Sequence, residues 1–241
     1  MVHVQFAPRR ALRAARILAN DPDDLPQVFT IIESLSMDTL ARIARRMGKS
    51  EIGRHLKATR PDIVSHLADR ASLARLPDGS LGRAYLAFVE REKISAAGIR
   101  DAGAKGMTNE FPLPPELVWV HARMRDTHDL WHAATGYAGD VLGETALLGF
   151  TFAQTWNPAI GLILAIGLSK ISAAPSGGAA ARRTIFDGVR RGKKAAWLPE
   201  QEWETMLALP VDEVRRRLAL EAPPVYAEIR SDALKTSLKA A

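Results

Sequence analysis

The sequence predicts an all-α protein folded as a single multi-helix domain over residues 1–241, and three observations support this fold class. Apolar residues recur at spacings of three and four through most of the chain, which is the period of an amphipathic helix. No run of residues shows the alternating apolar and polar pattern of a strand. Turn-forming residues separate the helical stretches, and 47% hydrophobic content in 241 residues can supply one sizeable core.

The first half of the chain contains five predicted helices, bounded by turn or capping signals. Ser36 precedes one of them as a candidate N-cap, and Gly48 ends it. The turn at Asp78 and Gly79 separates the last two. The predicted helices cover residues 8–19, 25–34, 36–48, 60–77 and 78–93.

The second half begins with a loop-like segment, residues 102–112. A long helix over residues 113–135 follows, with proline tolerated at its start. Two apolar helices come next and break near Asn157–Pro158. Residues 174–180 are predicted to be a flexible connection, and two or three C-terminal helices follow it. The chain is predicted to end in a loose tail over residues 226–241.

The most apolar stretch, residues 150–170, is predicted to be a buried helix pair and not a membrane span. Crossing a bilayer takes about 20 mainly apolar residues. This stretch contains Gln154, Asn157 and Pro158, so its unbroken apolar run covers only residues 159–168. The same residues can also form an apolar groove that holds a long hydrophobic ligand and opens toward a membrane.

The chain is basic, with a formal net charge of +6, and its arginines and lysines lie in clusters. Aromatic residues do not interleave with these cations as an RNA-stacking platform requires, so we expect no nucleic acid and favour a membrane surface. The arginines of residues 9–16 resemble a mitochondrial presequence, but apolar residues at helical spacing favour a basic first helix. Because the chain has no cysteine, disulfides and cysteine ligands are excluded.

The stretch HDLWHAATGYAGDVLGE contains the strongest candidate site. His128 and His132 are four residues apart and lie about 40° from one another around a helix, so they can bind one ion. Asp129 lies about 100° from His128, where it can be a ligand or can orient a histidine. Glu144 follows twelve residues after His132, which is too far for the same helix.

A helical hairpin would bring Glu144 back to the histidines. Gly136 and Gly139 can end the first helix, and Asp140 can N-cap a second helix that returns antiparallel. The twelve-residue step then places Glu144 level with His132, as in bundle sites built from facing helices. A capped helix pair with surface histidines explains the same pattern equally well.

Histidine and carboxylate donors without sulfur suit a divalent ion such as zinc, manganese, iron or magnesium. His121 and Arg125 lie seven and three residues before His128, on the same predicted stripe. His121 is a candidate proton donor, and Arg125 is a candidate partner for an anionic group of a substrate. A solvated helix face is the alternative explanation for both residues.

The pattern H-D-x-x-H, followed by eleven residues and a glutamate, resembles the signature of the coenzyme Q biosynthesis protein 4 family. LPDGSLGRAY, at residues 76–85, resembles that family's segment before the site helix, and residues 190–224 resemble its C-terminal end. The resemblance covers about residues 8–225. In this chain the signature residues are His128, Asp129, His132 and Glu144, without departure.

The resemblance implies an all-α fold, a divalent metal (usually zinc) on these four residues, and binding of a polyprenylated quinone precursor. It also implies peripheral membrane association and assembly with other ubiquinone-biosynthesis proteins. Because the arginine-rich start falls inside the family-like body, we expect a bacterial member that is cytoplasmic and peripheral on the inner membrane.

Two hypotheses for function follow from the resemblance. The first is a metal-dependent carboxy-lyase that removes the C1 carboxyl of a polyprenyl-hydroxybenzoate, with or without hydroxylation at that carbon. In this hypothesis Asp129, His121 and Arg125 are the candidate catalytic residues, and Asp129 is also a candidate ligand. The second is a non-catalytic lipid-binding scaffold with a structural metal. A homo-oligomer is compatible with either.

Overall fold

A computed structural model describes residues 6–21, 24–95, 98, 101, 104–105, 113–172, 178–222 and 224–230. In this part of the chain the fold is all-α, and the β pairing is limited to an isolated bridge between Ser80 and Pro210. The predicted single all-α domain is therefore confirmed.

In chain order, the described helices are α1 (Pro8–Asn20), α2 (Leu25–Leu35), α3 (Met37–Met47), α4 (Glu51–Thr59), α5 (Ile63–Ala68), α6 (Arg70–Ala74), α7 (Leu81–Glu92), α9 (Pro115–Asp126), α10 (His128–Thr135), α11 (Val141–Thr155), α12 (Pro158–Ser172), α13 (Gly178–Lys194), the 3₁₀ helix η1 (Leu198–Glu200), α14 (Trp203–Met206) and α15 (Val211–Arg217).

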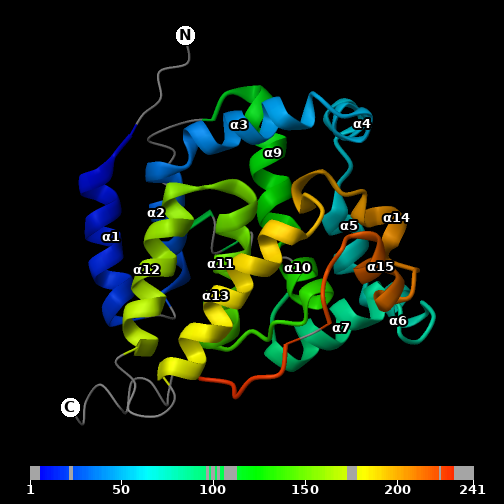
Figure 1. Ribbon diagram of the computed structural model, residues 1–241. Helices are drawn as coiled ribbons and strands as arrows, with labels where there is room; N and C mark the ends of the chain where they lie inside the picture. Colours follow the sequence, from blue (N-terminus) through cyan, green and yellow to red (C-terminus); the bar gives the residue numbers. More distant parts are fainter. Residues whose placement is uncertain are drawn as a thin grey trace.

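Helix α11 lies inside the fold and packs against α12 and α13 (Figure 1). Helices α1, α2 and α12 form one side of the molecule, and α5, α6, α7, α14 and α15 form the other (Figure 1). Helix α10 contacts α7, α9 and α15. The helices that carry the predicted site are thus covered by elements from both halves of the chain.

Glycines allow α11 and α13 to approach closely. A Cβ atom on Gly188 would overlap the backbone of Ala146, and one on Gly192 would overlap the backbone of Phe150. A larger residue at either position would push the helices apart, because the obstructing atoms are backbone. This contact holds α11, the helix that carries Glu144, against α13.

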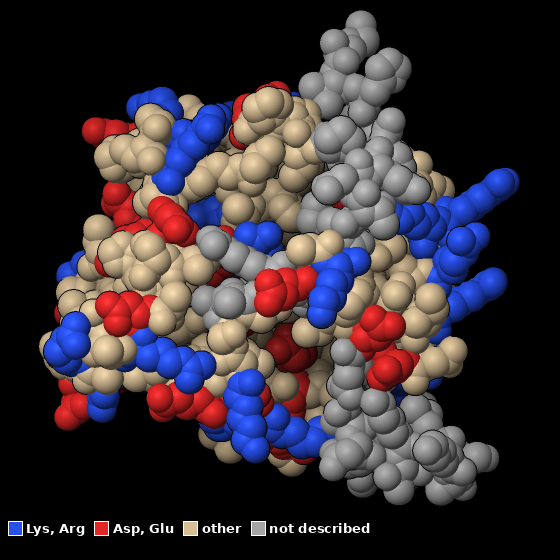
Figure 2. Space-filling model, turned by 180° about the vertical axis from the view of Figure 1, so that it is seen from behind, with Lys and Arg blue, Asp and Glu red and all other residues tan. Residues whose placement is uncertain are grey.

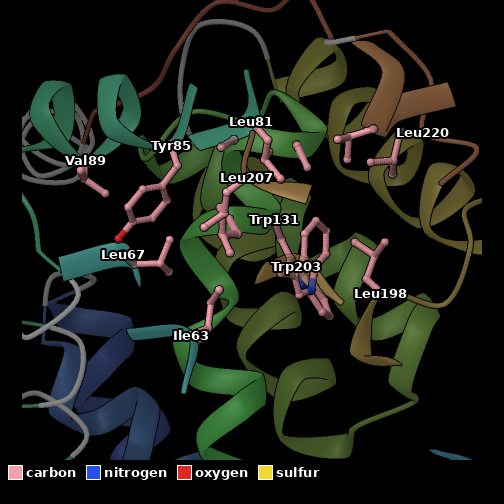
Figure 3. Close-up of a cluster of buried hydrophobic side chains, with 14 of the residues drawn as sticks. Ile63, Leu67, Leu81, Tyr85, Val89, Trp131, Leu198, Trp203, Leu207 and Leu220 are labelled. Atoms are coloured by element: carbon pink, nitrogen blue, oxygen red, sulfur yellow. The ribbon is translucent and has the colours of Figure 1, made fainter. Parts of the chain in front are cut away.

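The largest hydrophobic cluster anchors α10. Trp131 of α10 and Trp203 of α14 are 1% and 0% exposed, and they lie beside Leu198 (Figure 3). Tyr85 and Leu81 of α7 belong to the same cluster. Burial of each large apolar side chain contributes about 1.5–3 kcal/mol. Trp131 therefore fixes the helix on which both histidines lie.

Two predicted helices are divided in the structure. The helix predicted over residues 60–77 is α5 and α6, because Asp69 separates them and N-caps α6 by accepting from the backbone N–H of Ser72. The helix predicted over residues 113–135 is α9 and α10, which meet at Thr127. The hydroxyl of Thr127 donates to the carbonyl of Arg123 at 2.8 Å, a bond that bends helices.

The capping predictions have mixed outcomes. Helix α4 was not predicted, although Ser50 N-caps it by accepting from the backbone N–H of Gly53 at 2.9 Å. Ser36, the predicted N-cap of α3, makes no capping bond, and its hydroxyl instead donates to Asn157 at 3.0 Å. The predicted break in the apolar pair is confirmed, since Trp156 ends α11 at a φ of 50°.

Residues 226–230, predicted to begin a loose tail, are bound to the fold. Ile229 donates its backbone N–H to the carboxylate of Asp140 at 2.7 Å, which no local pattern in the tail indicates. Residues 231–241, and residues 102–112 apart from 104–105, lie outside the described part of the chain. Of the predicted flexible connection, residues 174–177 also lie outside it, and residues 178–180 begin α13.

No helix among the described residues is both long and apolar enough to cross a membrane. Residues 150–170 divide between α11 and α12, and neither helix meets this requirement. The prediction that these residues are not a membrane span is confirmed.

Candidate metal centre

The connection between α10 and α11 brings the predicted donors together. Gly136 ends α10 at a φ of 82°, a conformation that glycine adopts without strain. Asp140 N-caps α11 by accepting from the backbone N–H groups of Leu142 and Gly143 at 3.2 and 3.3 Å. The roles predicted for Gly136 and Asp140 are confirmed. Extended antiparallel packing of the two helices stays a prediction.

Three side chains converge on one point. His128, His132 and Glu144 each offer a ligand atom within 4.8 Å of the others. The two Nε2 atoms are 3.3 Å apart. Glu144 places Oε1 3.2 Å from Nε2 of His132 and Oε2 3.5 Å from Nε2 of His128. Helix α10 thus contributes its first residue and a residue one turn later, and α11 contributes a residue of its first turn.

These distances fit one divalent ion. Two ligands of a tetrahedral zinc ion, each bonded at about 2.0–2.1 Å, are about 3.3 Å apart. The two Nε2 atoms are 3.3 Å apart, and each lies 3.2 or 3.5 Å from a different oxygen of Glu144. With one ligand atom taken from each residue, all three atoms lie within 4.8 Å of one another. Residues His128, His132 and Glu144 would hold the ion, and its identity stays a prediction.

The ring of His132 is oriented by two residues that sequence reasoning missed. Its Nδ1 lies 3.0 Å from the backbone carbonyl of Tyr137 and donates to that oxygen, which leaves the Nε2 lone pair for a metal. Phe88 of α7 stacks on the same ring at 4.8 Å and 14°. Phe88 gives no local signal in the sequence, because only packing brings α7 to α10.

Two arginines support the end of α10. Arg191 of α13 donates to the carbonyl of Thr135 at 2.8 Å, and Arg215 of α15 donates to that of Ala134 at 2.9 Å. Arg191 also stacks over the ring of Tyr137 at 4.9 Å. Cations stabilise a helix C-terminus, where carbonyl groups lack partners within the helix. Both arginines therefore fix the turn that follows His132.

The donor group is open on one side. The side chain of His132 is 0% exposed, whereas those of His128 and Glu144 are 27% and 44% exposed. A small molecule can therefore approach the point where the three donors meet without displacing the buried histidine.

Attraction between opposite charges shifts the pKa values of Glu144 and His132 more than burial does. Partial burial would raise the pKa of the Glu144 carboxyl, but His132 and His128 outweigh it and hold that pKa well below its ordinary value. Burial would lower the pKa of His132, but Glu144 and Asp129 raise it. Protons and a metal thus compete for the same nitrogen atoms.

Asp129 lies close to the donors but is not one of the three that converge. It is 8% exposed, and burial raises the pKa of its carboxyl. The charges that act on it most are those of His128, His132 and Glu144. Its roles as a ligand and as a proton carrier both stay predictions.

His121 and Arg125 are not in the converging group. Burial and the charge of Arg125 lower the pKa of His121 to about 4, so its imidazole is neutral at pH 7. The negative charges of Asp126 and of Glu33 in α2 raise the pKa of His121, but they do not offset the effect of burial. Arg125 donates from Nε to Asp126 at 2.8 Å. The catalytic roles of His121 and Arg125 stay predictions.

The chain matches known proteins over a range that includes these site residues. The sequence profile of the family described as Coenzyme Q (ubiquinone) biosynthesis protein Coq4 matches residues 9–224. The chain belongs to this family. The predicted family is therefore confirmed, and its match includes all four signature residues of this Coq4 family member.

Individual relatives agree with the family assignment. The mitochondrial ubiquinone biosynthesis protein COQ4 homolog of Danio rerio is 32% identical over 214 residues, which are 87% of this chain and 75% of that protein. The mitochondrial ubiquinone biosynthesis protein coq4 of Talaromyces stipitatus is 35% identical over 194 residues, or 78% of this chain. This chain spans 63% of the length of that fungal protein.

A solved structure shares the fold. The crystal structure of a Nostoc punctiforme protein assigned to ubiquinone biosynthesis superposes with a TM-score of 0.66 at 24% identity. It covers 90% of this chain and 100% of the other. The prediction of a bacterial member on the inner membrane is not confirmed, because the two relatives above are named as mitochondrial proteins.

Proposed function

We propose that this Coq4 family member is a metal-dependent carboxy-lyase of ubiquinone biosynthesis, which removes the C1 carboxyl of a polyprenyl-hydroxybenzoate at a membrane surface. One observation carries the proposal. Three converging donors are open on one side, and a buried carboxyl with a raised pKa lies beside them. Metal, open position and proton source are the parts that such a reaction requires.

The open side favours catalysis over a purely structural metal. Structural zinc sites are closed by four protein ligands, whereas catalytic sites keep three protein ligands and one open position. Here three side chains converge, and two of them are partly exposed. The non-catalytic scaffold with a structural metal is the alternative that the assay below distinguishes.

A divalent ion, zinc by preference, would withdraw electron density from the oxygens of the head group and stabilise negative charge on them. Asp129 would hold the proton that replaces the carboxyl group. As the bond from C1 to the carboxylate breaks, the electron pair stays on the ring carbon and takes this proton, and carbon dioxide leaves. Burial raises the pKa of the Asp129 carboxyl, which is the direction that a proton donor requires. Arg125 is the candidate partner for the C1 carboxylate of the bound substrate, before that group leaves as carbon dioxide.

The isoprenoid tail would lie on apolar surface of α12. Leu162 and Ile166, which pack against one core cluster, and Leu164 and Leu168, which pack against another, are partly buried residues of this helix. Tail burial contributes about 0.8 kcal/mol per methylene group, so it can supply most of the affinity. Assembly with other ubiquinone-biosynthesis proteins, and self-association, remain predictions.

The assay is turnover of a short-chain prenyl-hydroxybenzoate by purified protein, with carbon dioxide release measured by mass spectrometry. We expect turnover with added zinc, manganese, iron or magnesium and none after chelation. Parallel reactions with and without oxygen determine whether a hydroxyl group is added at C1. Protein that binds metal but releases no carbon dioxide with any of these ions would support the scaffold instead.

Membrane association would use the outer face of α1. Arg9, Arg13 and Arg16 are exposed on this helix, beside Leu12 and Ile17, which are 56% and 41% exposed. Figure 2 shows cationic side chains projecting from the edge of the molecule that α1 forms. Clustered cations are attracted to anionic lipid, and the flanking apolar side chains can insert at the surface.

Removing the three exposed arginines of α1 is expected to release the protein from anionic vesicles. Each cation near such a surface contributes about 1 kcal/mol, so the triple change of Arg9, Arg13 and Arg16 to glutamine is expected to weaken binding about 100-fold. Co-sedimentation with phosphatidylcholine vesicles, with and without phosphatidylglycerol, measures this. The matched control changes the exposed Arg45, Arg54 and Lys193 to glutamine. Equal losses in both variants would show net charge, not α1, to be responsible.

A further inference from the structure

We propose that residues 225–230, termed the C-terminal strap, set the donor geometry of the metal centre by clamping the connection between α10 and α11. Figure 1 shows the strap in red, running below α10 toward the lower end of α13. The strap lies beyond the residues that match the family, 9–224. This inference rests on the proposed metal site and assigns it a positioning residue, Tyr226.

Asp140 is the point where the strap and the site helix meet. This N-cap of α11 is 1% exposed. Besides its two capping bonds, it accepts from the hydroxyl of Tyr226 at 3.1 Å and from the backbone N–H of Ile229 at 2.7 Å. Val141 donates its backbone N–H to the carbonyl of Ile229 at 2.9 Å. A buried carboxylate with four donors has a single well-defined position.

Tyr226 ties both sides of the connection together. Its hydroxyl donates to Asp140 and accepts from the backbone N–H of Ala138 at 2.9 Å. Its ring lies 6.3 Å from that of Tyr137, whose carbonyl orients His132. One hydroxyl thus bridges the segment that links His132 to Glu144.

The other side of the strap is anchored to α7. Glu228 pairs with Arg91, and Arg230 pairs with Glu92 at 2.7 Å. Glu92 also accepts from the backbone N–H of Gly139 at 3.3 Å. Helix α7 carries Phe88, which stacks on His132. The strap therefore joins the helix that supports His132 to the start of the helix that carries Glu144.

The first turn of α11 links the position of Asp140 to that of the proposed metal ligand Glu144. Glu144 donates its backbone N–H to the carbonyl of Asp140 at 2.8 Å, so Glu144 moves with Asp140. Displacement of Asp140 would change the 3.2 Å separation between Glu144 and His132. Partners of metal ligands typically affect metal affinity by about 10- to 100-fold.

Two truncations test the strap. A chain ending at Arg230 keeps it, and a chain ending at Pro224 lacks it. With Zn²⁺ affinity measured by competition against a chromophoric chelator, we expect the longer chain to match the full chain. The shorter chain is expected to bind Zn²⁺ about 10- to 100-fold more weakly. Tyr226→Phe removes only the bridging hydroxyl and is expected to weaken binding about tenfold, so the test survives if the shorter chain does not fold.

The outcomes separate the strap from the site. Equal Zn²⁺ affinity in the full chain and in Tyr226→Phe, with a lower melting temperature in the variant, would assign the strap a structural role only and overturn this inference. Weaker Zn²⁺ binding by Tyr226→Phe, with an unchanged circular dichroism spectrum, would support the positioning role of the hydroxyl. A full chain that binds none of zinc, manganese, iron and magnesium would instead overturn the proposed metal site.

Discussion

Replacing Glu144 with glutamine is expected to lower Zn²⁺ affinity more than about 100-fold and to reduce C1 decarboxylation to background. The change removes the anionic member of the donor group and leaves two imidazoles, which hold a divalent ion poorly. Loss of a partner that only supports a ligand already costs about 10- to 100-fold, so loss of a charged ligand costs more. His128→Ala is expected to have the same effect on both quantities.

Three measurements check this prediction. Chelator competition gives the affinity, metal analysis of the purified protein gives the content, and carbon dioxide release gives the activity. Glu116→Gln is the matched control, because Glu116 is exposed at the start of α9, away from the donor group. A Glu144→Gln protein that keeps full metal content and normal turnover would refute the site.

Asp129→Asn is expected to separate metal binding from chemistry. Asparagine has nearly the same shape but cannot supply the proton that C1 requires, so turnover should fall by about 100- to 10,000-fold. Zn²⁺ affinity should change only a few-fold, because Asp129 is not among the three converging donors. Both quantities are measured on the same preparation, with circular dichroism to verify the fold.

The opposite result is equally informative. If Asp129→Asn loses Zn²⁺ to the same extent as Glu144→Gln, Asp129 is a fourth ligand and not a proton source. A variant with unchanged turnover would exclude both roles and leave the raised pKa of its carboxyl as a consequence of burial alone.

The predicted helices agree best with the structure where the signal in the sequence is local. The apolar spacing of residues 8–19 and 25–34 predicts α1 and α2, although burial of their apolar residues is incomplete, since Leu12 and Ile17 of α1 are 56% and 41% exposed. The divisions at Asp69 and Thr127 were not predicted. In both places a short polar side chain bonds to nearby backbone, and helical periodicity on either side conceals the interruption.

In the candidate site, too, the sequence predicts the local features and not those that depend on packing. Spacing on one helix predicts that His128 and His132 meet, and the glycine and aspartate signals at Gly136 and Asp140 predict the return of Glu144. Asp129 could not be assigned from spacing. Helical geometry fixes its angle to the histidines, but only the packing of α10 decides that its side chain is buried beside the donors without joining the converging group.

By itself, the sequence determined the all-α class, the family and a candidate site of His128, Asp129, His132 and Glu144, because all depend on residue spacing along the chain. The structure brings three of these four residues together. Only the tertiary structure decided what surrounds those donors. Phe88 stacks on His132, Arg191 supports the end of α10, and Tyr226 clamps Asp140 from 86 residues away. No local pattern encodes such contacts, because they exist only after distant helices have buried their apolar faces together.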